Sequence, residues 1–382
     1  MKKKLLSLLL CVTMVATALT ACGGGSDTEE TTTQTETQET TEAETTETEE
    51  TTEVTETTVE AVEQRRIYVT PEWVKSVIDG QQPESANYVL LEVSYGMTAD
   101  DSPSYNEGHI PGAIHASIME VEDATGDEVG AYNLLSAEQI RDYALSHGIT
   151  KDTVVIMYAG DNDNSGVARH AYGYLYTGVE NVKILNGNLN AWVNAGYELE
   201  TTANTGTVAT DFGVEVPAHP EYWVSIEDAL DRVQNDENFK LVSIRAKEEW
   251  LGETSGYTYM SKAGEPEGAV WGKGCNTAYD VAGFCNEDGT VKELDEVLAT
   301  EWADVDFTVD NHLSFYCGTG WRATVPFMIM YQEGYDNISV YDGGWYQWIM
   351  KSDYPVQVGD PASETCVHTT VGELSDDKAA TN

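Results

Sequence analysis

The sequence predicts an α/β fold that is built twice along the chain, with mostly parallel sheets flanked by helices. Short apolar runs typical of buried strands occur at residues 88–93 and 240–245. Runs typical of central strands occur at residues 152–158 and 312–316, and each leads through a polar or glycine-bearing loop into a helix. Corresponding segments lie about 150 residues apart, which is the length of a domain and not of a solenoid unit.

The elements between these strands also have counterparts in both halves. A glycine-rich turn reads Gly-His-Ile-Pro-Gly-Ala at residues 108–113 and Gly-Glu-Pro-Glu-Gly-Ala at residues 264–269. Helices with capping signals begin at Ser136 and Ser225, although the second precedes the first strand of its own half. Each half then closes with a strand, a glycine turn and a helix that contains tryptophan, at residues 182–192 and 338–348.

Composition limits the classes of function. The chain has 382 residues, and 20 Lys and Arg against 66 Asp and Glu give a formal net charge of −46. A surface of that sign repels polyphosphate backbones, so nucleic-acid binding is excluded. The chain is 41% apolar, which is enough to form cores, and six cysteines are too few for a disulfide scaffold in a chain of this length.

The N-terminus predicts export and a lipid anchor. Three lysines at residues 2–4 precede the apolar run 5–19, which is too short for an ordinary membrane span. The sequence Leu-Thr-Ala-Cys that ends at Cys22 resembles the lipobox of bacterial lipoproteins. The resemblance implies a signal peptide over residues 1–21, acylation such as palmitoylation at Cys22, and anchoring on the extracytoplasmic face of the cell membrane. The alternative is an ordinary secretory signal that has a chance cysteine near its end.

Two segments carry no pattern of a folded domain. Residues 22–65 are almost only Thr and Glu, with fourteen carboxylates between Asp27 and Glu63, and we expect a disordered tether. Residues 359–382 form a polar tail, in which we expect Cys366 to be unstructured.

The order of motifs in the remaining sequence resembles the rhodanese domain. The turn at residues 108–113 and the Asp-Gly-Gly-x-x-x-Trp element at residues 342–348 carry the resemblance, and the duplication is similar to tandem sulfurtransferases of the thiosulfate and 3-mercaptopyruvate type. The resemblance implies two rhodanese-like domains, at residues 66–215 and 216–358. The first half has no cysteine in its corresponding loop, so we expect it to be catalytically silent and to form one wall of the cleft.

The second half contains a candidate catalytic loop at the junction of a strand and a helix, at residues 317–322. A thiolate at Cys317 could attack a sulfane sulfur and carry it as a persulfide. The glycines at positions 318 and 320 allow successive N–H groups to surround the sulfur, and the start of the following helix adds its positive dipole end. We expect Arg322 to contact an anionic donor or leaving group. The loop resembles the rhodanese active-site loop, and the competing interpretation is an inert buried cysteine that ends a core strand.

The length of this loop separates two kinds of chemistry. Cysteine-based phosphatases have five residues between Cys and Arg, whereas here only Gly318, Thr319, Gly320 and Trp321 intervene, and the shorter loop suits a single sulfur. We assign these four residues to substrate binding. Trp321 departs from the family pattern, and either walls one side of the pocket or gates the acceptor.

Arg245 is a second candidate contact to the substrate, because it resembles the arginine of an Asp-x-Arg motif that here reads Ser-Ile-Arg. The alternative is a structural arginine paired with Glu248 or Glu249. His109 in the first glycine turn is more typical of a turn residue bonded to the backbone than of a catalytic residue.

The remaining cysteines and histidines indicate no cofactor. Cys275 and Cys285 could form a disulfide in an oxidising exterior or remain free thiols, and no spacing suggests a metal site. We therefore expect a sulfurtransferase without metal or organic cofactor, which takes sulfur from a small anionic donor such as thiosulfate or 3-mercaptopyruvate to a thiol or cyanide through Cys317. The alternative is a cell-surface lipoprotein that binds or senses sulfur without turnover.

Overall fold

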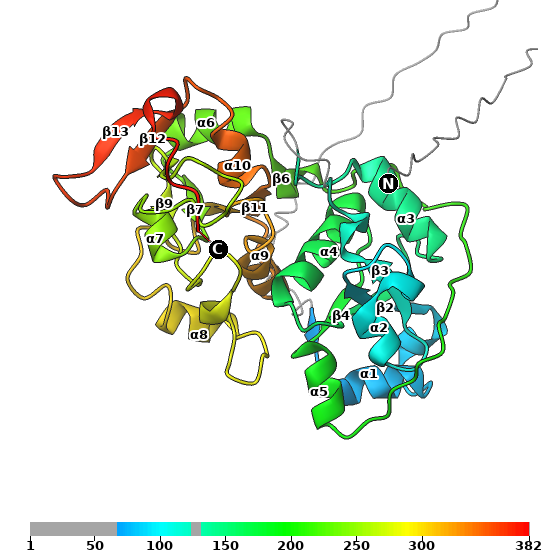
Figure 1. Ribbon diagram of the computed structural model, residues 1–382. Coiled ribbons are helices and arrows are strands. Elements are labelled where there is room, and N and C mark those ends of the chain that lie inside the picture. Colours follow the sequence, from blue (N-terminus) through cyan, green and yellow to red (C-terminus); the bar gives the residue numbers. More distant parts are fainter. Residues whose placement is uncertain (1–66, 124–130, 382) are drawn as a thin grey trace, which may run out of the picture. The chain divides into compact units, whose positions relative to one another are not determined.

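The computed structural model describes residues 67–123 and 131–381 of the chain. Both halves are α/β, and each contains a five-stranded parallel sheet with helices packed against it (Figure 1). The predicted fold class is therefore confirmed. The predicted signal peptide, the tether and Cys22 lie outside the described residues. Among the helices that the structure describes, none is long and apolar enough to cross a membrane.

The sheet of the first half has the strand order β1-β5-β4-β2-β3. Its two inner strands, β4 (Val154–Ala159) and β2 (Tyr88–Ser94), are apolar along most of their length and pair in parallel. Strands buried on both faces read as continuous apolar runs, which is why the sequence identified them. The other elements of this half are β1 (Tyr68–Val69), α1 (Pro71–Ile78), α2 (Pro103–Glu107), β3 (Ile114–Ser117), α3 (Ala137–Ser146), α4 (Asn164–Thr177), β5 (Val182–Leu185) and α5 (Asn188–Asn194).

The sheet of the second half has the corresponding order β6-β11-β10-β7-β9. Strands β10 (His312–Tyr316) and β7 (Phe239–Ser243) are adjacent, with Tyr316 opposite Ser243. Because parallel strands end at the same edge of a sheet, the loops that follow β10 and β7 meet there. The other elements are β6 (Trp223–Val224), α6 (Ile226–Asn235), α7 (Lys247–Trp250), β8 (Glu265–Pro266), β9 (Val270–Trp271), α8 (Leu294–Ala299), α9 (Thr324–Gln332), β11 (Ile338–Tyr341) and α10 (Gly344–Trp348).

The predicted helix starts are confirmed in both halves. The hydroxyl of Ser136 accepts a hydrogen bond from the N–H of Gln139 at the start of α3. The hydroxyl of Ser225 accepts one from the N–H of Asp228 at the start of α6. Each serine satisfies an N–H that the first helical turn leaves without a partner, so both positions act as N-caps.

The C-terminal region is more ordered than the sequence indicated. Strands β12 (Pro355–Val358) and β13 (Val367–Thr370) pair in antiparallel fashion, and β12 also pairs with β8. Cys366 directly precedes β13, so the expectation that it lies in unstructured sequence is wrong. The polar, β-branched stretch of β13 gains its order from pairing with β12, which is a contact that composition alone does not reveal.

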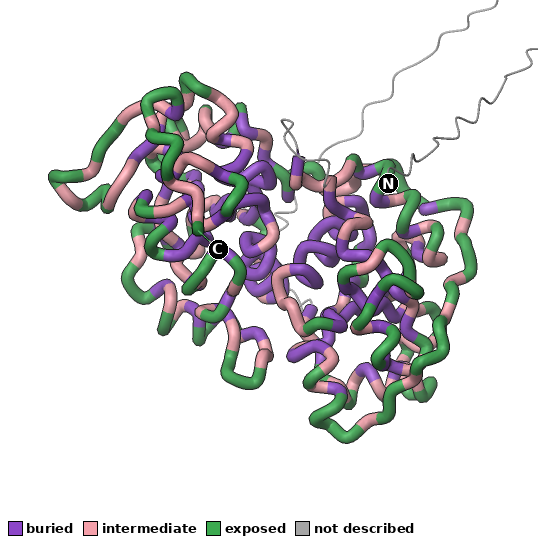
Figure 2. Tube along the Cα trace, in the orientation of Figure 1, coloured by how far each residue is buried: buried purple, intermediate pink, exposed green. Residues whose placement is uncertain are grey.

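The two halves share an apolar contact between α4 and α9. Every residue of α9 is buried, and α4 is buried along most of its length (Figure 2). The rings of Tyr172 and Phe327 meet edge to face with their centroids 5.0 Å apart. The apolar core therefore continues from one half into the other.

A buried ionic cluster also joins the halves. Arg169 on α4 donates from Nε to Oε2 of Glu122 at 3.0 Å, and its guanidinium also pairs with Asp342, which follows β11. The other carboxylate oxygen of Asp342 accepts the N–H of Leu134 at 2.6 Å. Burial raises the pKa of Glu122 to about 8, although Arg169 acts to lower it. Asp342 is therefore the main counter-charge of Arg169.

Replacing Arg169 tests this cluster. Arg169→Ala should lower the free energy of unfolding by about 3–5 kcal/mol, because it leaves the buried carboxylate of Asp342 without its counter-charge. Urea unfolding measures the change. The matched control is Arg141→Ala, which removes a half-buried surface arginine paired with its exposed neighbour Asp142 and should cost less than about 1 kcal/mol. Equal losses of unfolding free energy in the two variants would refute the contribution of the ionic cluster to stability.

The core of the first half contains an unpaired histidine. Both ring nitrogens of His170 are buried and have no hydrogen-bond partner among the described residues. Burial lowers its pKa from 6.5 to about 4, so the ring is neutral in the folded protein near pH 7. The unfolded chain binds the proton more tightly, and folding stability must therefore fall as the pH falls from about 6.5 towards 4.

We expect His170 to contribute up to about 3 kcal/mol to this acid destabilisation. His170→Leu should flatten the dependence of the unfolding free energy on pH between those limits, as measured by urea unfolding at several pH values. His368→Leu is the matched control, because its side chain is 54% exposed and should keep the wild-type slope. Identical slopes in wild type and His170→Leu would contradict the assignment.

Candidate active site

Cys317 follows β10 at the edge of the sheet where the loops of the second half meet. Its side chain lies beneath the surface, and the residue is 1% exposed. The carbonyl of Cys317 accepts the N–H of Trp345 at 2.9 Å, and the carbonyl of Gly318 accepts the N–H of Tyr346 at 3.0 Å. The first turn of α10 therefore holds the start of the candidate catalytic loop through two main-chain hydrogen bonds.

Gly320 allows the loop to approach the ionic cluster between the halves. Its φ is +86°, and a Cβ there would lie 2.7 Å from Oδ1 of Asp342 and 2.8 Å from a guanidinium nitrogen of Arg169. Any larger residue would need both a strained backbone and a displaced cluster. The first half thus reaches the loop that carries Cys317, although it has no catalytic cysteine of its own.

The main-chain N–H groups of residues 318–322 are the donors that the sequence analysis expected to bind an anion. Within the described parts of the chain, none of them donates a hydrogen bond to another backbone group. Helix α9 begins two residues after Arg322, and its first turn has no side-chain cap. These donors remain available to an anion. That they surround the sulfur stays a prediction.

Arg322 lies at the end of the loop and is tied to Glu249. Its terminal nitrogens contact the two carboxylate oxygens of Glu249 at 2.9 and 3.1 Å, and one also donates to the hydroxyl of Tyr257 at 3.0 Å. Burial alone would lower the pKa of Arg322, but Glu249 holds it well above its ordinary value. The buried Nε has no hydrogen-bond partner among the described residues.

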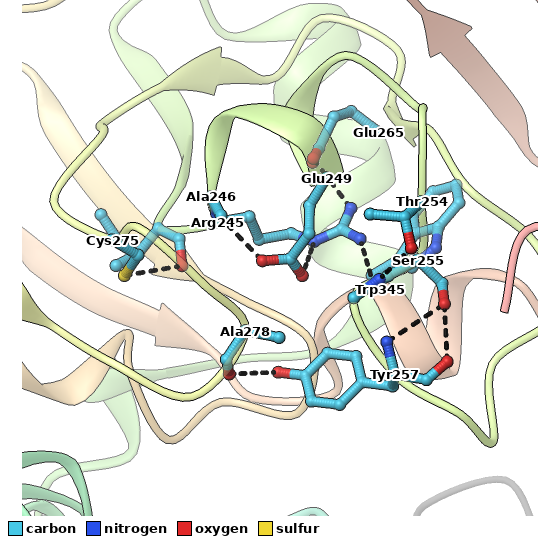
Figure 3. A network of polar contacts seen from close by, with 12 residues as sticks. Arg245, Ala246, Glu249, Thr254, Ser255, Tyr257, Glu265, Cys275, Ala278 and Trp345 are labelled. Carbon is cyan, nitrogen blue, oxygen red and sulfur yellow. Dashed lines mark hydrogen bonds and ion pairs between the residues drawn. The ribbon is translucent and has the colours of Figure 1, made fainter. Parts of the chain in front are cut away.

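Arg245 is fully buried beside the same carboxylate (Figure 3). Its guanidinium donates to Glu249 at 3.1 Å, to Glu265 at 2.8 Å, and to the carbonyls of Gly264 and Ser255 at 2.7 and 3.1 Å. The ion pair with Glu249 is one of those that the sequence analysis considered. A direct contact with substrate stays a prediction, and it would require Arg245 to give up one of these partners.

The two arginines form a nearly neutral cluster with Glu249 and Glu265. Burial acts to raise the pKa of Glu249, but Arg322 and Arg245 outweigh it and the pKa is lowered. Burial raises the pKa of Glu265 to about 7, against the effect of Arg245. Glu249 is thus the shared counter-charge of both arginines. The sequence indicated Glu249 as a partner of Arg245 but gave no signal that it also binds Arg322.

A cavity of about 300 Å³ opens over the catalytic loop and is lined from both halves. Thr319, Trp321 and Arg322 supply its floor from the loop, so Trp321 is part of the pocket lining. The indole of Trp321 also lies beside the buried carboxyl of Glu122. The walls are aromatic and carry one carboxylate from the first half: Tyr95, Tyr132, Tyr257, Tyr259, Tyr279 and Asp163. Sequence reasoning missed these five tyrosines, because they come from four separated segments of the chain.

The other cysteines that the structure describes, Cys275, Cys285 and Cys366, are free thiols. Burial raises the pKa of Cys275 to about 12 and that of Cys285 to about 11. Neither is therefore a good nucleophile near neutral pH. Both ring nitrogens of His109 lie within hydrogen-bond distance of carbonyls, at 2.8 Å from Tyr105 and 3.1 Å from Thr202, as expected for a turn residue. The described residues contain no group of three or more His, Cys, Asp or Glu that could hold a metal ion.

Comparisons with known proteins agree with this geometry. The sequence model of the rhodanese-like domain matches residues 70–195 and 225–351. Thiosulfate sulfurtransferase YnjE of Escherichia coli is 35% identical over 297 residues, which cover 76% of this chain and 65% of that relative, just under two thirds of its length. The sulfur carrier protein TtuD of Thermus thermophilus is 27% identical over 310 residues, which cover 77% of this chain and 97% of the relative.

Two solved structures extend the comparison. The crystal structure of YnjE has a TM-score of 0.70 and 35% identity, over 77% of this chain and 68% of that one. An anaerobic ergothioneine biosynthesis enzyme from Chlorobium limicola, in complex with its natural substrate trimethyl histidine, has a TM-score of 0.71 and 32% identity, over 78% of this chain and 72% of that one. With two matched domains that span most of its folded sequence, the chain belongs to the rhodanese-like domain family.

Proposed function

We propose that the protein is a sulfurtransferase whose nucleophile and sulfur carrier is Cys317. The observation that carries the proposal is the position of Cys317, which directly follows a central strand and begins the candidate catalytic loop. Thr319, Trp321 and Arg322 of this loop line a cavity, and its main-chain N–H groups bond to no other backbone group among the described residues. Ligands bind at this edge of α/β sheets. The names of the relatives support sulfur transfer as the type of reaction.

With thiosulfate as donor, the reaction proceeds in two displacements. The thiolate of Cys317 bonds to the outer sulfur while the S–S bond of thiosulfate breaks, and sulfite leaves with the electron pair. An acceptor such as cyanide or a thiolate then bonds to the outer sulfur of the persulfide, and the thiolate of Cys317 returns. The N–H groups of residues 318–322, the start of α9 and the free Nε of Arg322 would stabilise the negative sulfur between the two steps.

A second candidate acceptor is a molecule that carries a quaternary ammonium group, such as trimethylhistidine. Tyrosine and tryptophan faces attract cations, and a carboxylate in the wall strengthens that attraction. Arg322 is the one cationic side chain among the residues that line the cavity, and it is paired with Glu249. The wall supplied by the tyrosines and Asp163 therefore suits a cation better than an anion. The Chlorobium limicola relative, which binds trimethyl histidine, supports this candidate.

We also propose that the protein acts outside the cytoplasm, held at the membrane through acylated Cys22. The basic start, the apolar run and the Leu-Thr-Ala-Cys sequence of residues 1–22 support this localisation. The acidic tether of residues 22–65 would then separate the folded part from the anchor.

Cys317→Ser tests the reaction directly. Wild-type protein incubated with thiosulfate should gain one sulfur atom by intact mass and then form thiocyanate when cyanide is added, whereas Cys317→Ser should do neither. Cys366→Ser is the matched control, because it removes a free thiol of the C-terminal hairpin and should behave as wild type. Failure of the wild type with thiosulfate, 3-mercaptopyruvate and polysulfide would favour a binding or sensing role without turnover.

Asp163→Asn tests the cationic acceptor. The amide oxygen can still accept the N–H of Ser165 that caps α4, at 2.9 Å in the wild type, but the negative charge in the wall is lost. The apparent KM for trimethylhistidine should rise by up to about fivefold, which corresponds to about 1 kcal/mol, while that for cyanide should not change. Asp161→Asn removes the same charge from a residue outside the lining and serves as the control. Equal effects of the two variants, or no use of trimethylhistidine by the wild type, would contradict this candidate.

A further inference from the structure

The C-terminal strap, residues 374–380, is hydrogen-bonded to the loop that connects α7 to β8. This tyrosine loop, residues 254–262, contains no helix or strand of its own. The carbonyl of Lys378 accepts the N–H of Ser255 at 2.8 Å, and the N–H of Lys378 donates to the carbonyl of Ser261 at 2.8 Å. The N–H of Ala380 donates to the carbonyl of Tyr257 at 3.0 Å. Main-chain hydrogen bonds from the strap therefore reach both arms of the loop.

Side chains reinforce one end of this contact. Lys262 bonds to Asp376 at 2.9 Å and to the carbonyl of Leu374 at 2.9 Å, and the hydroxyl of Ser261 donates to Asp376 at 3.0 Å. The side chain of Asp376 is 72% exposed, so its ion pair contributes little by itself. The main-chain hydrogen bonds are the stronger restraint, because they fix the backbone of the loop itself, which is also held by Arg245 at the carbonyl of Ser255 and by Trp345 at the carbonyl of Lys262.

The strap acts on the part of the loop that forms the cavity wall. Tyr257 and Tyr259 both line the cavity over the catalytic loop. The carbonyl of Tyr257 is held by the strap, and its hydroxyl donates to the carbonyl of Ala278 at 3.2 Å and accepts from Arg322 at 3.0 Å. The ring of Tyr257 packs so closely on Gly318 that a side chain at that position would collide with it. Contacts thus run from the strap through Tyr257 to the loop that carries Cys317.

The strap is not part of the repeated domain. The family match ends at residue 351, and the strap begins 23 residues later. Its contacts with the tyrosine loop therefore lie outside the part of the chain that matches the rhodanese-like domain. A restraint outside the shared fold can alter one wall of the cavity and leave the strands beneath Cys317 unchanged.

We propose that the C-terminal strap positions Tyr257 and Tyr259 as the acceptor-binding wall of the cavity, so that it sets how well acceptors larger than cyanide bind. The proposal rests on the sulfur transfer at Cys317 proposed above. Loss of the strap should loosen the wall without removing the thiol or its loop. The step with thiosulfate, which needs only the sulfur of Cys317 and nearby donors, should change less than the step with a larger acceptor.

The test removes one hydrogen bond of the strap by proline substitution in the full chain. Ala380→Pro deletes the N–H that bonds to Tyr257, whereas the matched control Ala379→Pro introduces the same residue at a position that is not one of the strap's donors. Hydrogen–deuterium exchange follows the amides of residues 254–262. Steady-state kinetics with thiosulfate as donor give the KM for each of two acceptors, dithiothreitol and cyanide. A variant that ends at Glu373 removes the strap altogether.

Ala380→Pro should speed amide exchange in the tyrosine loop and raise the KM for dithiothreitol by roughly tenfold, because small displacements of binding groups are costly. The rate of sulfur uptake by Cys317 and the KM for cyanide should stay within about twofold of wild type. The variant that ends at Glu373 should show the same pattern, and Ala379→Pro should match the wild type.

Two results would overturn the proposal. One is unchanged exchange of residues 254–262 in both Ala380→Pro and the variant that ends at Glu373. The other is a dithiothreitol KM that does not change, or that changes equally in Ala380→Pro and Ala379→Pro. Absence of sulfur uptake by the wild type would instead refute the proposed sulfur transfer, and amide exchange would still decide whether the strap holds the tyrosine loop.

Discussion

The candidate catalytic loop depends on two buried carboxylates that lie on opposite sides of it. Glu249 holds Arg322 at the end of the loop, and Asp342 with Arg169 forms the surface against which Gly320 rests. Charges this deeply buried are stable only when paired, so loss of either carboxylate leaves an arginine uncompensated next to the loop. The first half has no cysteine for catalysis, but it supplies Arg169, and this contribution gives a physical reason for its tight packing on the second half.

The pairing of arginines with buried carboxylates also limits the positive charge that is available to bind a substrate. Arg322 and Arg245 share Glu249, and Glu265 adds a further carboxyl group, so the site has little free positive side-chain charge. Negative charge on sulfur must then be stabilised mainly by main-chain N–H groups, the start of α9 and the Nε of Arg322. Under the proposed function, the tyrosines and Asp163 that line the cavity would favour acceptors that are aromatic or cationic. Donor and acceptor would thus use different parts of one cavity.

The sequence predicted the features that depend on local pattern. β10 has the predicted bounds, α9 follows the loop of Cys317 as expected, and the serine caps of α3 and α6 begin the predicted helices. The pairing of Arg169 with Asp342 could not be predicted, because the two residues lie 173 positions apart and belong to different halves. The strap was missed for the same reason, since polar residues near Lys378 gain order only from the tyrosine loop. Local periodicity determined the strands and helices, whereas long-range polar contacts complete the site.

The proposed sulfur transfer requires that Cys317, and not Cys275, Cys285 or Cys366, carries the transferred sulfur. Peptide mapping by mass spectrometry after incubation with thiosulfate, with free thiols and persulfides labelled at low temperature before digestion, tests it most directly. We expect one persulfide, located on the peptide that contains Cys317, and unmodified thiols at Cys275, Cys285 and Cys366. Sulfur located on any of those three cysteines, with an unmodified Cys317, would contradict it.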